Sequence, residues 1–278
     1  MQQKGLIVSF YQTLQRRWHD SNSLVCVGLD PQPERFPEPF QHSATGIFEF
    51  NQAIIDATHD LVCAYKPQIA HYAALGAEDQ LEETIDYIQT EYPGIPVILD
   101  SKRGDIGSTA TMYARESFER YEADAVTVNP YMGWDTIEPF ARYKDKGVIV
   151  LCRTSNPSAS ELQNLKLESG EPLFARIARQ AAEHWNQHQN LALVVGATAP
   201  AELASVRQIV GDMPILVPGL GAQGGDAEAV MRAGLTAQGD GLIINSSRGI
   251  TYASDKDDFA EAARQATQDL VNLANQFR

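Results

Sequence analysis

Short apolar runs recur along the chain, and each is followed by a longer segment in which apolar residues return every three or four positions. Continuous apolar runs are typical of parallel strands buried on both faces, and the longer spacing is typical of helices. The expected strands are residues 24–29, 62–66, 97–100, 125–128, 148–152, 191–195, 215–217 and 241–244. The pattern therefore predicts a repeated strand and helix unit.

Helical segments complete these units at residues 47–61, 81–88, 108–121, 137–143, 174–188, 200–210, 226–233 and 258–277. Strict alternation of strands and helices indicates a parallel sheet covered by helices, and eight units favour an α/β fold of the (β/α)8 type, a TIM barrel. An open doubly wound sheet is the alternative, because periodicity does not reveal whether a sheet closes. Since no composition shift marks a linker, we expect a single domain over residues 1–278.

Three segments lie outside this repeat. An extra N-terminal helix is predicted by apolar residues at helical spacing, namely Leu6, Phe10, Leu14 and Trp18. Four prolines punctuate residues 31–46, which we expect to be an irregular loop, and residues 154–170 are rich in Ser, Asn and Pro and predict a second long loop.

Charge and cysteine content narrow the class of protein. A formal net charge of -14 argues against nucleic acid or an anionic membrane as the main partner. Three cysteines are a poor disulfide framework, and the six histidines and the cysteines show no zinc spacing. Residues 1–20 contain neither a signal sequence nor a membrane-spanning run. We expect a soluble, cytoplasmic protein without a bound metal.

One strand end concentrates charged residues. Asp100 closes the expected strand 97–100, Lys102 follows two residues later, and Asp105 comes three residues after that. If the strand conformation continues, Asp100 and Lys102 project from the same side. In the alternative interpretation this is an ordinary loop in which Asp105 caps the next helix.

Other strands also end in polar residues, and in a (β/α)8 barrel these ends form the active site. Asp30 and Lys66 follow the first two strands, and Thr154 and Ser155 follow the fifth. Polar residues are common where a strand meets solvent, so each position alone has an ordinary explanation. Lys66 is the stronger candidate, because a lysine on an apolar strand is costly unless it is paired.

The last two units predict a phosphate site. A glycine-rich run with the pattern G-x-G-x-x-G follows the seventh strand at residues 219–224. A dinucleotide site is the weaker interpretation, because that motif belongs in the first unit of a Rossmann fold and requires an acid after the next strand, where Asn245 stands. Loops after strands seven and eight bind phosphate in many barrels, so Gln223 and Arg248 are the expected ligands.

These residues together resemble a known family. The run 100–106 is similar to the D-x-K-x-x-D signature of orotidine 5'-phosphate decarboxylase. The other blocks of that family occur in the same order, as Gly28-Leu29-Asp30-Pro31, Lys66-Pro67, Pro218-Gly219-Leu220-Gly221 and Ser247-Arg248-Gly249. The two long loops resemble the longer bacterial branch, type 2. The resemblance implies a homodimeric barrel that converts orotidine 5'-monophosphate to uridine 5'-monophosphate and carbon dioxide without metal or organic cofactor.

The resemblance also implies roles for single residues. It makes Lys66, Asp100, Lys102 and Asp105 a charged catalytic tetrad, in which Lys102 protonates C6 of the pyrimidine and Asp105 reaches into the neighbouring subunit's site. Asp100 would lie near the departing carboxylate, and Asp30 and Lys66 near the ribose. The remaining substrate contacts implied are Thr109 across the dimer, Pro218, Gln223, Ser247, Arg248, and either Thr154 or Ser155.

Elementary chemistry agrees with a charged lysine. Loss of carbon dioxide leaves negative charge on C6, which an ammonium stabilises and then protonates. Carboxylates beside Lys102 favour its charged form, whereas Schiff-base chemistry needs a neutral amine. Two alternatives stay open: a magnesium-dependent sugar-phosphate decarboxylase or hexulose-phosphate synthase with the same signature, and a nucleotide-binding protein without turnover.

Overall fold

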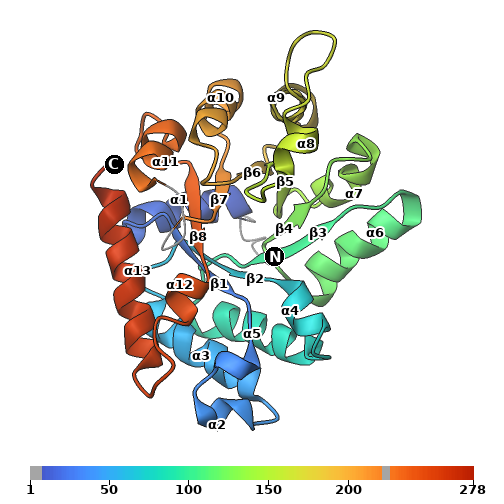
Figure 1. Ribbon diagram of the computed structural model, residues 1–278. Coiled ribbons are helices and arrows are strands. Elements are labelled where there is room, and N and C mark those ends of the chain that lie inside the picture. The colour runs from blue at the N-terminus through green and yellow to red at the C-terminus, as the bar shows by residue number, and fades with distance from the viewer. Residues whose placement is uncertain (1–7, 221–225) are drawn as a thin grey trace, which may run out of the picture.

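The computed structural model describes residues 8–220 and 226–278, and in it a ring of helices surrounds a barrel of parallel strands (Figure 1). The strands are β1 (Val25–Leu29), β2 (Ala64–Pro67), β3 (Ile98–Arg103), β4 (Ala125–Val128), β5 (Gly147–Arg153), β6 (Leu191–Val195), β7 (Ile215–Pro218) and β8 (Leu242–Ser246). Strands such as β1, β4 and β6 are buried along their whole length, as strands between a packed interior and a layer of helices must be.

The order of strands closes the sheet into a barrel. Hydrogen-bonded neighbours run β2-β1-β8-β7-β6-β5-β4-β3, which leaves β2 and β3 at the two ends. Isolated parallel bridges join these end strands, Tyr65 to Val97 and Gln68 to Asp100. The (β/α)8 prediction is therefore confirmed, and the open doubly wound sheet is wrong.

The helices that the sequence predicted are found in the structure. They are α1 (Phe10–Asp20), α3 (Gly46–Thr58), α5 (Glu78–Glu91), α6 (Gly107–Arg115), α7 (Glu138–Ala141), α9 (Leu173–Gln180), α10 (Pro200–Val210), α11 (Ala227–Gly234) and α13 (Phe259–Asn275). Short π-helical turns extend α6 and α9, at η2 (Glu116–Arg120) and η4 (Ala181–Trp185). Each expected helix is thus present.

Short helices replace two segments that the sequence predicted to be irregular. Residues 31–46 contain η1 (Pro33–Arg35) and α2 (Glu38–Gln41), and residues 154–170 contain α8 (Ala159–Gln163). Prolines interrupt regular structure in general, but Pro33 and Pro39 occupy first-turn positions of η1 and α2, where the missing N–H costs nothing. Other short helices are α4 (Ile69–Ala73), η3 (Trp134–Thr136) and α12 (Arg248–Thr251).

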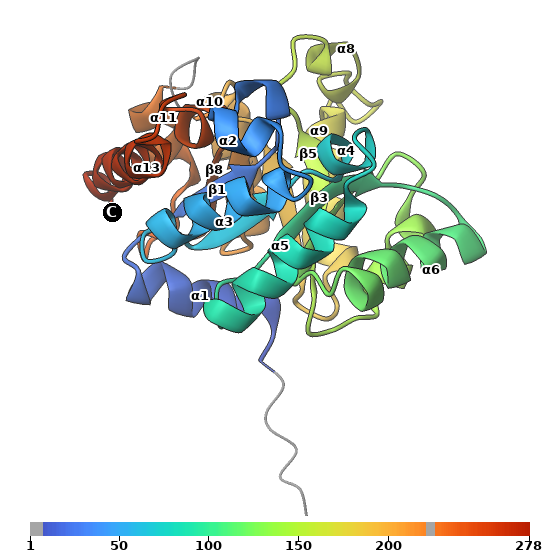
Figure 2. The ribbon, with the colours of Figure 1, turned by 90° about the horizontal axis from the view of Figure 1, so that it is seen from below.

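The predicted N-terminal helix covers one end of the barrel. α1 begins after Ser9, whose side chain forms a capping box with Gln12, and Leu6 lies outside the described residues. The Phe10 ring packs where any side chain at Gly147, the first residue of β5, would collide with it. Figure 2 shows α1 at one end of the molecule, with α2, α4 and α8 at the other. The carboxyl ends of the strands are therefore the end available for a site.

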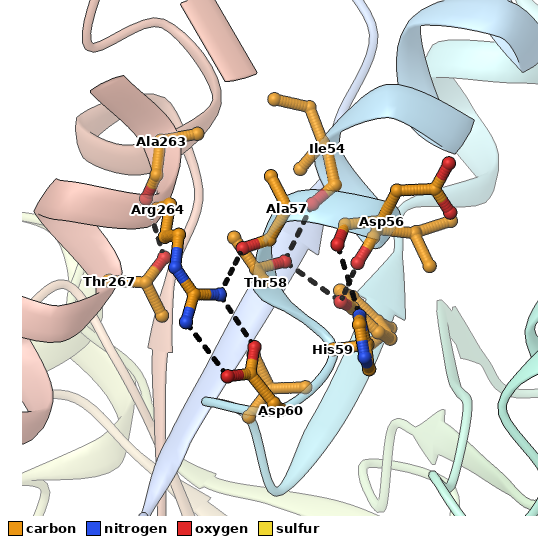
Figure 3. A network of polar contacts seen from close by, with 12 residues as sticks. Ile54, Asp56, Ala57, Thr58, His59, Asp60, Ala263, Arg264 and Thr267 are labelled. Carbon is orange, nitrogen blue, oxygen red and sulfur yellow. Dashed lines mark hydrogen bonds and ion pairs between the residues drawn. The ribbon is translucent and has the colours of Figure 1, made fainter. Parts of the chain in front are cut away.

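An exposed ion pair connects α13 with Asp60, two residues after the end of α3 (Figure 3). The Arg264 guanidinium donates to both carboxylate oxygens of Asp60 at 2.6 and 2.8 Å and to the Ala57 carbonyl at 2.8 Å. Hydrogen bonding to this guanidinium lowers the pKa of Asp60. The last helix is thereby attached to the helix of the first unit.

Candidate active site

The end of β3 departs from regular strand geometry. Lys102 has a φ of +48°, and the register with β4 shifts between Leu99 and Arg103. The Thr127 hydroxyl of β4 accepts hydrogen bonds from the backbone N–H groups of Ser101 (3.0 Å) and Lys102 (2.9 Å). The Thr127 hydroxyl thus serves as hydrogen-bond acceptor for the backbone N–H groups of two consecutive residues, in place of the backbone of β4. Asp100 and Lys102 meet, as the sequence led us to expect if the strand continued, and β3 does continue to Arg103, although with an irregular register.

Asp100 lies between two lysines. Its Oδ2 accepts from Lys66 Nζ at 2.9 Å, and its Oδ1 accepts from Lys102 Nζ at 2.7 Å and from the Thr127 hydroxyl at 2.8 Å. Lys66 and Asp100 are buried, whereas the Lys102 side chain is 46% exposed. Lys102 is therefore the more accessible of the two cations in this cluster.

Burial and charge act in opposite directions on these groups. Burial by itself lowers the pKa of the Lys66 ammonium, but the carboxylates of Asp100 and Asp30 raise it more, so that pKa lies above its ordinary value. Burial raises the pKa of the Asp100 carboxyl, but Lys66 and Lys102 lower it more, to well below its usual range. The buried pair is therefore ionised at neutral pH.

A cavity of about 500 Å³ opens beside this cluster. Six predicted site residues line it: Lys66, Asp100, Lys102, Thr154, Ser155 and Pro218. The lining residues that the sequence did not single out are Thr127, Leu151, Asn156, Gln163, Val194 and Leu216. Charged groups and polar groups of the β5 loop share the lining of the cavity, as expected for a site that binds a polar molecule.

The β5 loop is ordered around Thr154. Gln163 on α8 accepts from the Thr154 backbone N–H at 2.8 Å and donates to the Thr154 hydroxyl at 2.8 Å. Asn156 is 2.6 Å from the same hydroxyl. Thr154 and Ser155 both line the cavity, so the choice between them stays open. The sequence did not single out Gln163 and Asn156, because they lie in a loop where most residues are polar and no pattern marks a ligand.

Asp30 lies near the cluster without lining the cavity. Its carboxylate contributes to the raised pKa of Lys66. Its Oδ1 atom is buried and has no hydrogen-bond partner within the described part of the chain. A buried carboxylate oxygen without a hydrogen-bond partner is unusual in a folded protein.

The predicted phosphate residues lie at the β8 end. Arg248 is exposed at the start of α12, and Ser247 packs so closely against β1 that a Cβ at Gly28 would come within 2.7 Å of the Ser247 Cβ. Neither residue lines the cavity, and Gln223 lies outside the described residues. This part of the site stays a prediction.

Asp105 and Thr109 do not join the cluster of their own chain. The Asp105 carboxylate accepts from the Ile106 backbone N–H at 2.8 Å, and Lys102 forms its ion pair with Asp100 instead. Thr109 is exposed on α6. The arrangement of Lys102 between two carboxylates is therefore not formed within one described chain.

Residues 8–220 and 226–278 lack two features. No three His, Cys, Asp or Glu side chains in these ranges group as metal ligands. No helix there is long and apolar enough to cross a membrane.

A closed parallel barrel with a buried lysine and aspartate cluster, opening to a cavity at the carboxyl ends of its strands, defines a (β/α)8-barrel enzyme. Residues 23–265 match the family model "Orotidine 5'-phosphate decarboxylase / HUMPS family". The chain belongs to this family.

Named relatives agree with the family model. The chain is 59% identical over 273 residues to orotidine 5'-phosphate decarboxylase of Cellvibrio japonicus, covering 98% of this chain and 100% of that one. It is 60% identical over 269 residues to the Azoarcus enzyme of that name, covering 97% and 99%. The resemblance seen in the sequence is therefore confirmed.

Solved structures agree as well. The Leishmania donovani OMP decarboxylase is 38% identical with a TM-score of 0.83, covering 96% of this chain and 99% of that chain. The UMP synthase of the same organism is 41% identical with a TM-score of 0.87, and the match covers 97% of this chain but 56% of that one.

Proposed function

We propose that this chain converts orotidine 5'-monophosphate to uridine 5'-monophosphate and carbon dioxide, with Lys102 as the proton donor. The observation that carries the mechanism is the position of Lys102, whose ammonium is held by Asp100 at 2.7 Å and lines the cavity. The curated relatives named above carry this activity in their names. The product places the enzyme in pyrimidine nucleotide synthesis.

The reaction needs positive charge at one atom. The bond between C6 and the carboxylate breaks, carbon dioxide leaves, and the electron pair remains on C6. The Lys102 ammonium stabilises this charge and transfers its proton to C6, and water restores the proton to the amine. Asp100 orients the ammonium, because two of its three protein partners are the Lys102 and Lys66 ammonium groups.

The rest of the substrate would extend from this point. We assign the ribose hydroxyls to Asp30 and Lys66, which the unpaired Oδ1 of Asp30 supports. The pyrimidine would lie between Lys102 and the β5 loop, at Thr154 or Ser155, with Pro218 beside it. The phosphate is assigned to Gln223, Ser247 and Arg248. Binding of the phosphate, which is remote from C6, supplies binding energy that can lower the barrier to reaction at that carbon.

A second copy of the chain would complete each site. We propose a homodimer in which Asp105 and Thr109 contribute to the partner's site. Large apolar side chains around these residues are exposed: Ile106 59%, Met112 57%, Tyr131 84% and Met132 45%. Exposed apolar side chains gathered near a site are typical of a surface that another subunit covers.

The cellular location stays a prediction. Cys26, Cys63 and Cys152 are buried free thiols, which agrees with the cytoplasm proposed from their odd number.

Decarboxylation in excess chelator tests the activity. We expect the orotate absorbance of orotidine monophosphate to be lost at the same rate with and without chelator. Loss of turnover on chelation would instead favour the magnesium-dependent members of the wider superfamily.

The Lys102→Ala variant tests the mechanism in the same assay. We expect no measurable turnover, because the charge and proton source are removed, while uridine monophosphate still binds. Turnover near that of the parent enzyme would exclude Lys102 as the proton donor.

A further inference from the structure

After β1 ends, backbone groups of the chain form hydrogen bonds with side chains of distant elements instead of with neighbouring strands. β1 ends at Leu29, which pairs with Pro67 of β2, and η1 begins at Pro33. Between them the chain carries Asp30. Backbone polar groups shielded from water must find partners elsewhere when the strand ladder ends.

Tyr252 supplies two of these partners. Its hydroxyl accepts from the Gln32 backbone N–H at 2.7 Å and donates to the Asp30 carbonyl at 3.1 Å. Burial raises the pKa of Tyr252, so the hydroxyl keeps the proton that it donates. The Tyr252 hydroxyl thus bridges the Asp30 carbonyl and the Gln32 N–H, which lie on either side of Pro31.

Two side chains of α4 satisfy the adjacent carbonyls. The Tyr72 hydroxyl donates to the Leu29 carbonyl at 3.2 Å, and His71 Nδ1 lies 3.0 Å from the Pro31 carbonyl. Three consecutive carbonyls are therefore held by side chains from outside the segment.

The Tyr252 ring is itself fixed in place. It stacks on Phe50 at 5.8 Å and on Phe36 at 6.5 Å between ring centroids, and the Arg35 guanidinium lies 4.2 Å from its centroid. The residue directly follows α12, which begins at Arg248. A fixed ring directly after α12, the helix that starts with a proposed phosphate ligand, thus bonds the backbone of a proposed ribose ligand.

We propose that Tyr252 is a positioning residue, whose hydroxyl holds the Asp30 carboxylate where it faces Lys66 and the ribose of the substrate. The inference rests on the role proposed for Asp30. Asp30 has no hydrogen bond that fixes its Oδ1 within the described residues, so its position depends on its backbone. Small misplacements of a binding group are expensive in a site that orients its substrate.

Tyr252→Phe tests the proposal, because it removes the hydroxyl and keeps the ring. We expect kcat/KM to fall about three- to tenfold, the range of one lost hydrogen bond. The inhibition constant of uridine monophosphate should rise by a similar factor. In an Asp30→Asn background, the same substitution should change neither value, because the group that Tyr252 positions is already lost.

Tyr92→Phe is the matched control. It also deletes a hydroxyl, one that donates to Asp56 at 2.7 Å in the outer layer, and it should leave the kinetics unchanged. If Tyr252→Phe fails to fold, Tyr72→Phe serves as the second variant, with the same expected dependence on Asp30.

Three results would overturn the inference: unchanged kinetics in Tyr252→Phe, an equal effect with and without Asp30, or parent-like kinetics in Asp30→Asn. The last result rejects the role of Asp30 itself. The first two reject Tyr252 and leave the proposed decarboxylation intact.

Discussion

Thr127 supports the reactive end of β3 through a single hydroxyl. That oxygen accepts from two backbone N–H groups and donates to Asp100. Thr127 is 1% exposed, so water cannot take over the hydrogen bonds of its hydroxyl. A side chain from β4 therefore holds both the carboxylate and the unusual backbone of Lys102, whose positive φ is costly in a residue other than glycine.

Thr127→Val tests this support with almost no change of shape. We expect kcat to fall at least about tenfold and the free energy of unfolding to drop by about 1–3 kcal/mol, because two part-buried N–H groups lose their acceptor. Steady-state kinetics and urea denaturation measure the two effects. Thr127→Ser keeps the hydroxyl and is the control. Equal kcat values in the two variants would contradict the role.

The site residues that could be predicted from the sequence are those at the carboxyl ends of strands. Lys66, Asp100 and Lys102 end apolar strands, and a parallel barrel brings such ends together. Thr127 was not predictable, because in the run Ala125–Val128 a threonine is also an ordinary strand former. The positive φ of Lys102 arises from these tertiary hydrogen bonds and has no local sequence signal.

At the scale of elements, Arg264 of α13 bonds the Ala57 carbonyl of α3 and pairs with Asp60, just after that helix. The pKa of Asp60 is lowered in the folded chain, chiefly by its hydrogen bonds to Arg264. A carboxyl with a lowered pKa stabilises the fold above its unfolded pKa, and the contribution is lost as the pH falls through the folded pKa.

Asp60→Asn should therefore lower the urea midpoint at pH 7 but not in acid. Both partners are about half exposed, so the loss should stay below about 1 kcal/mol. The difference from the parent chain should shrink as the pH falls below about 4. Urea titrations between pH 7 and pH 3 measure it, and a difference that is constant over this range would contradict the ionic origin.

Long helices and short helices differed in how well they could be predicted. A helix such as α5 repeats its apolar spacing over several turns, whereas α4 and α8 have five residues each. One turn is too short to show periodicity, and tertiary contacts decide whether it forms. The side chain of Gln68 caps α4, for example, by accepting from the Ala70 backbone N–H.

At the scale of the whole molecule, the proposed dimer makes each active site depend on two chains. Lys102→Ala and Asp105→Ala should each be inactive alone. Mixed with free exchange of subunits, half the dimers are heterodimers, and each has one site with both residues intact. We expect about a quarter of the parent activity to return, measured after refolding the mixture. No recovery despite demonstrated exchange would contradict a shared site.

The sequence predicted the barrel because eight units repeat one pattern, but it could not place Asp105. A residue that acts on another chain has no partner in its own fold. In the described chain Asp105 bonds only its neighbour Ile106, so the single chain leaves its role a proposal.

Pairing between the first and last strands has a consequence for synthesis on the ribosome. β1 pairs with β8, and the segment after β1 depends on Tyr252, more than 220 residues later. Until that part of the chain has emerged, one edge of β1 and the carbonyl of Asp30 lack their native partners. The nascent protein thus acquires a closed barrel, and the native backbone around Asp30, only after β8 and Tyr252 have been synthesised.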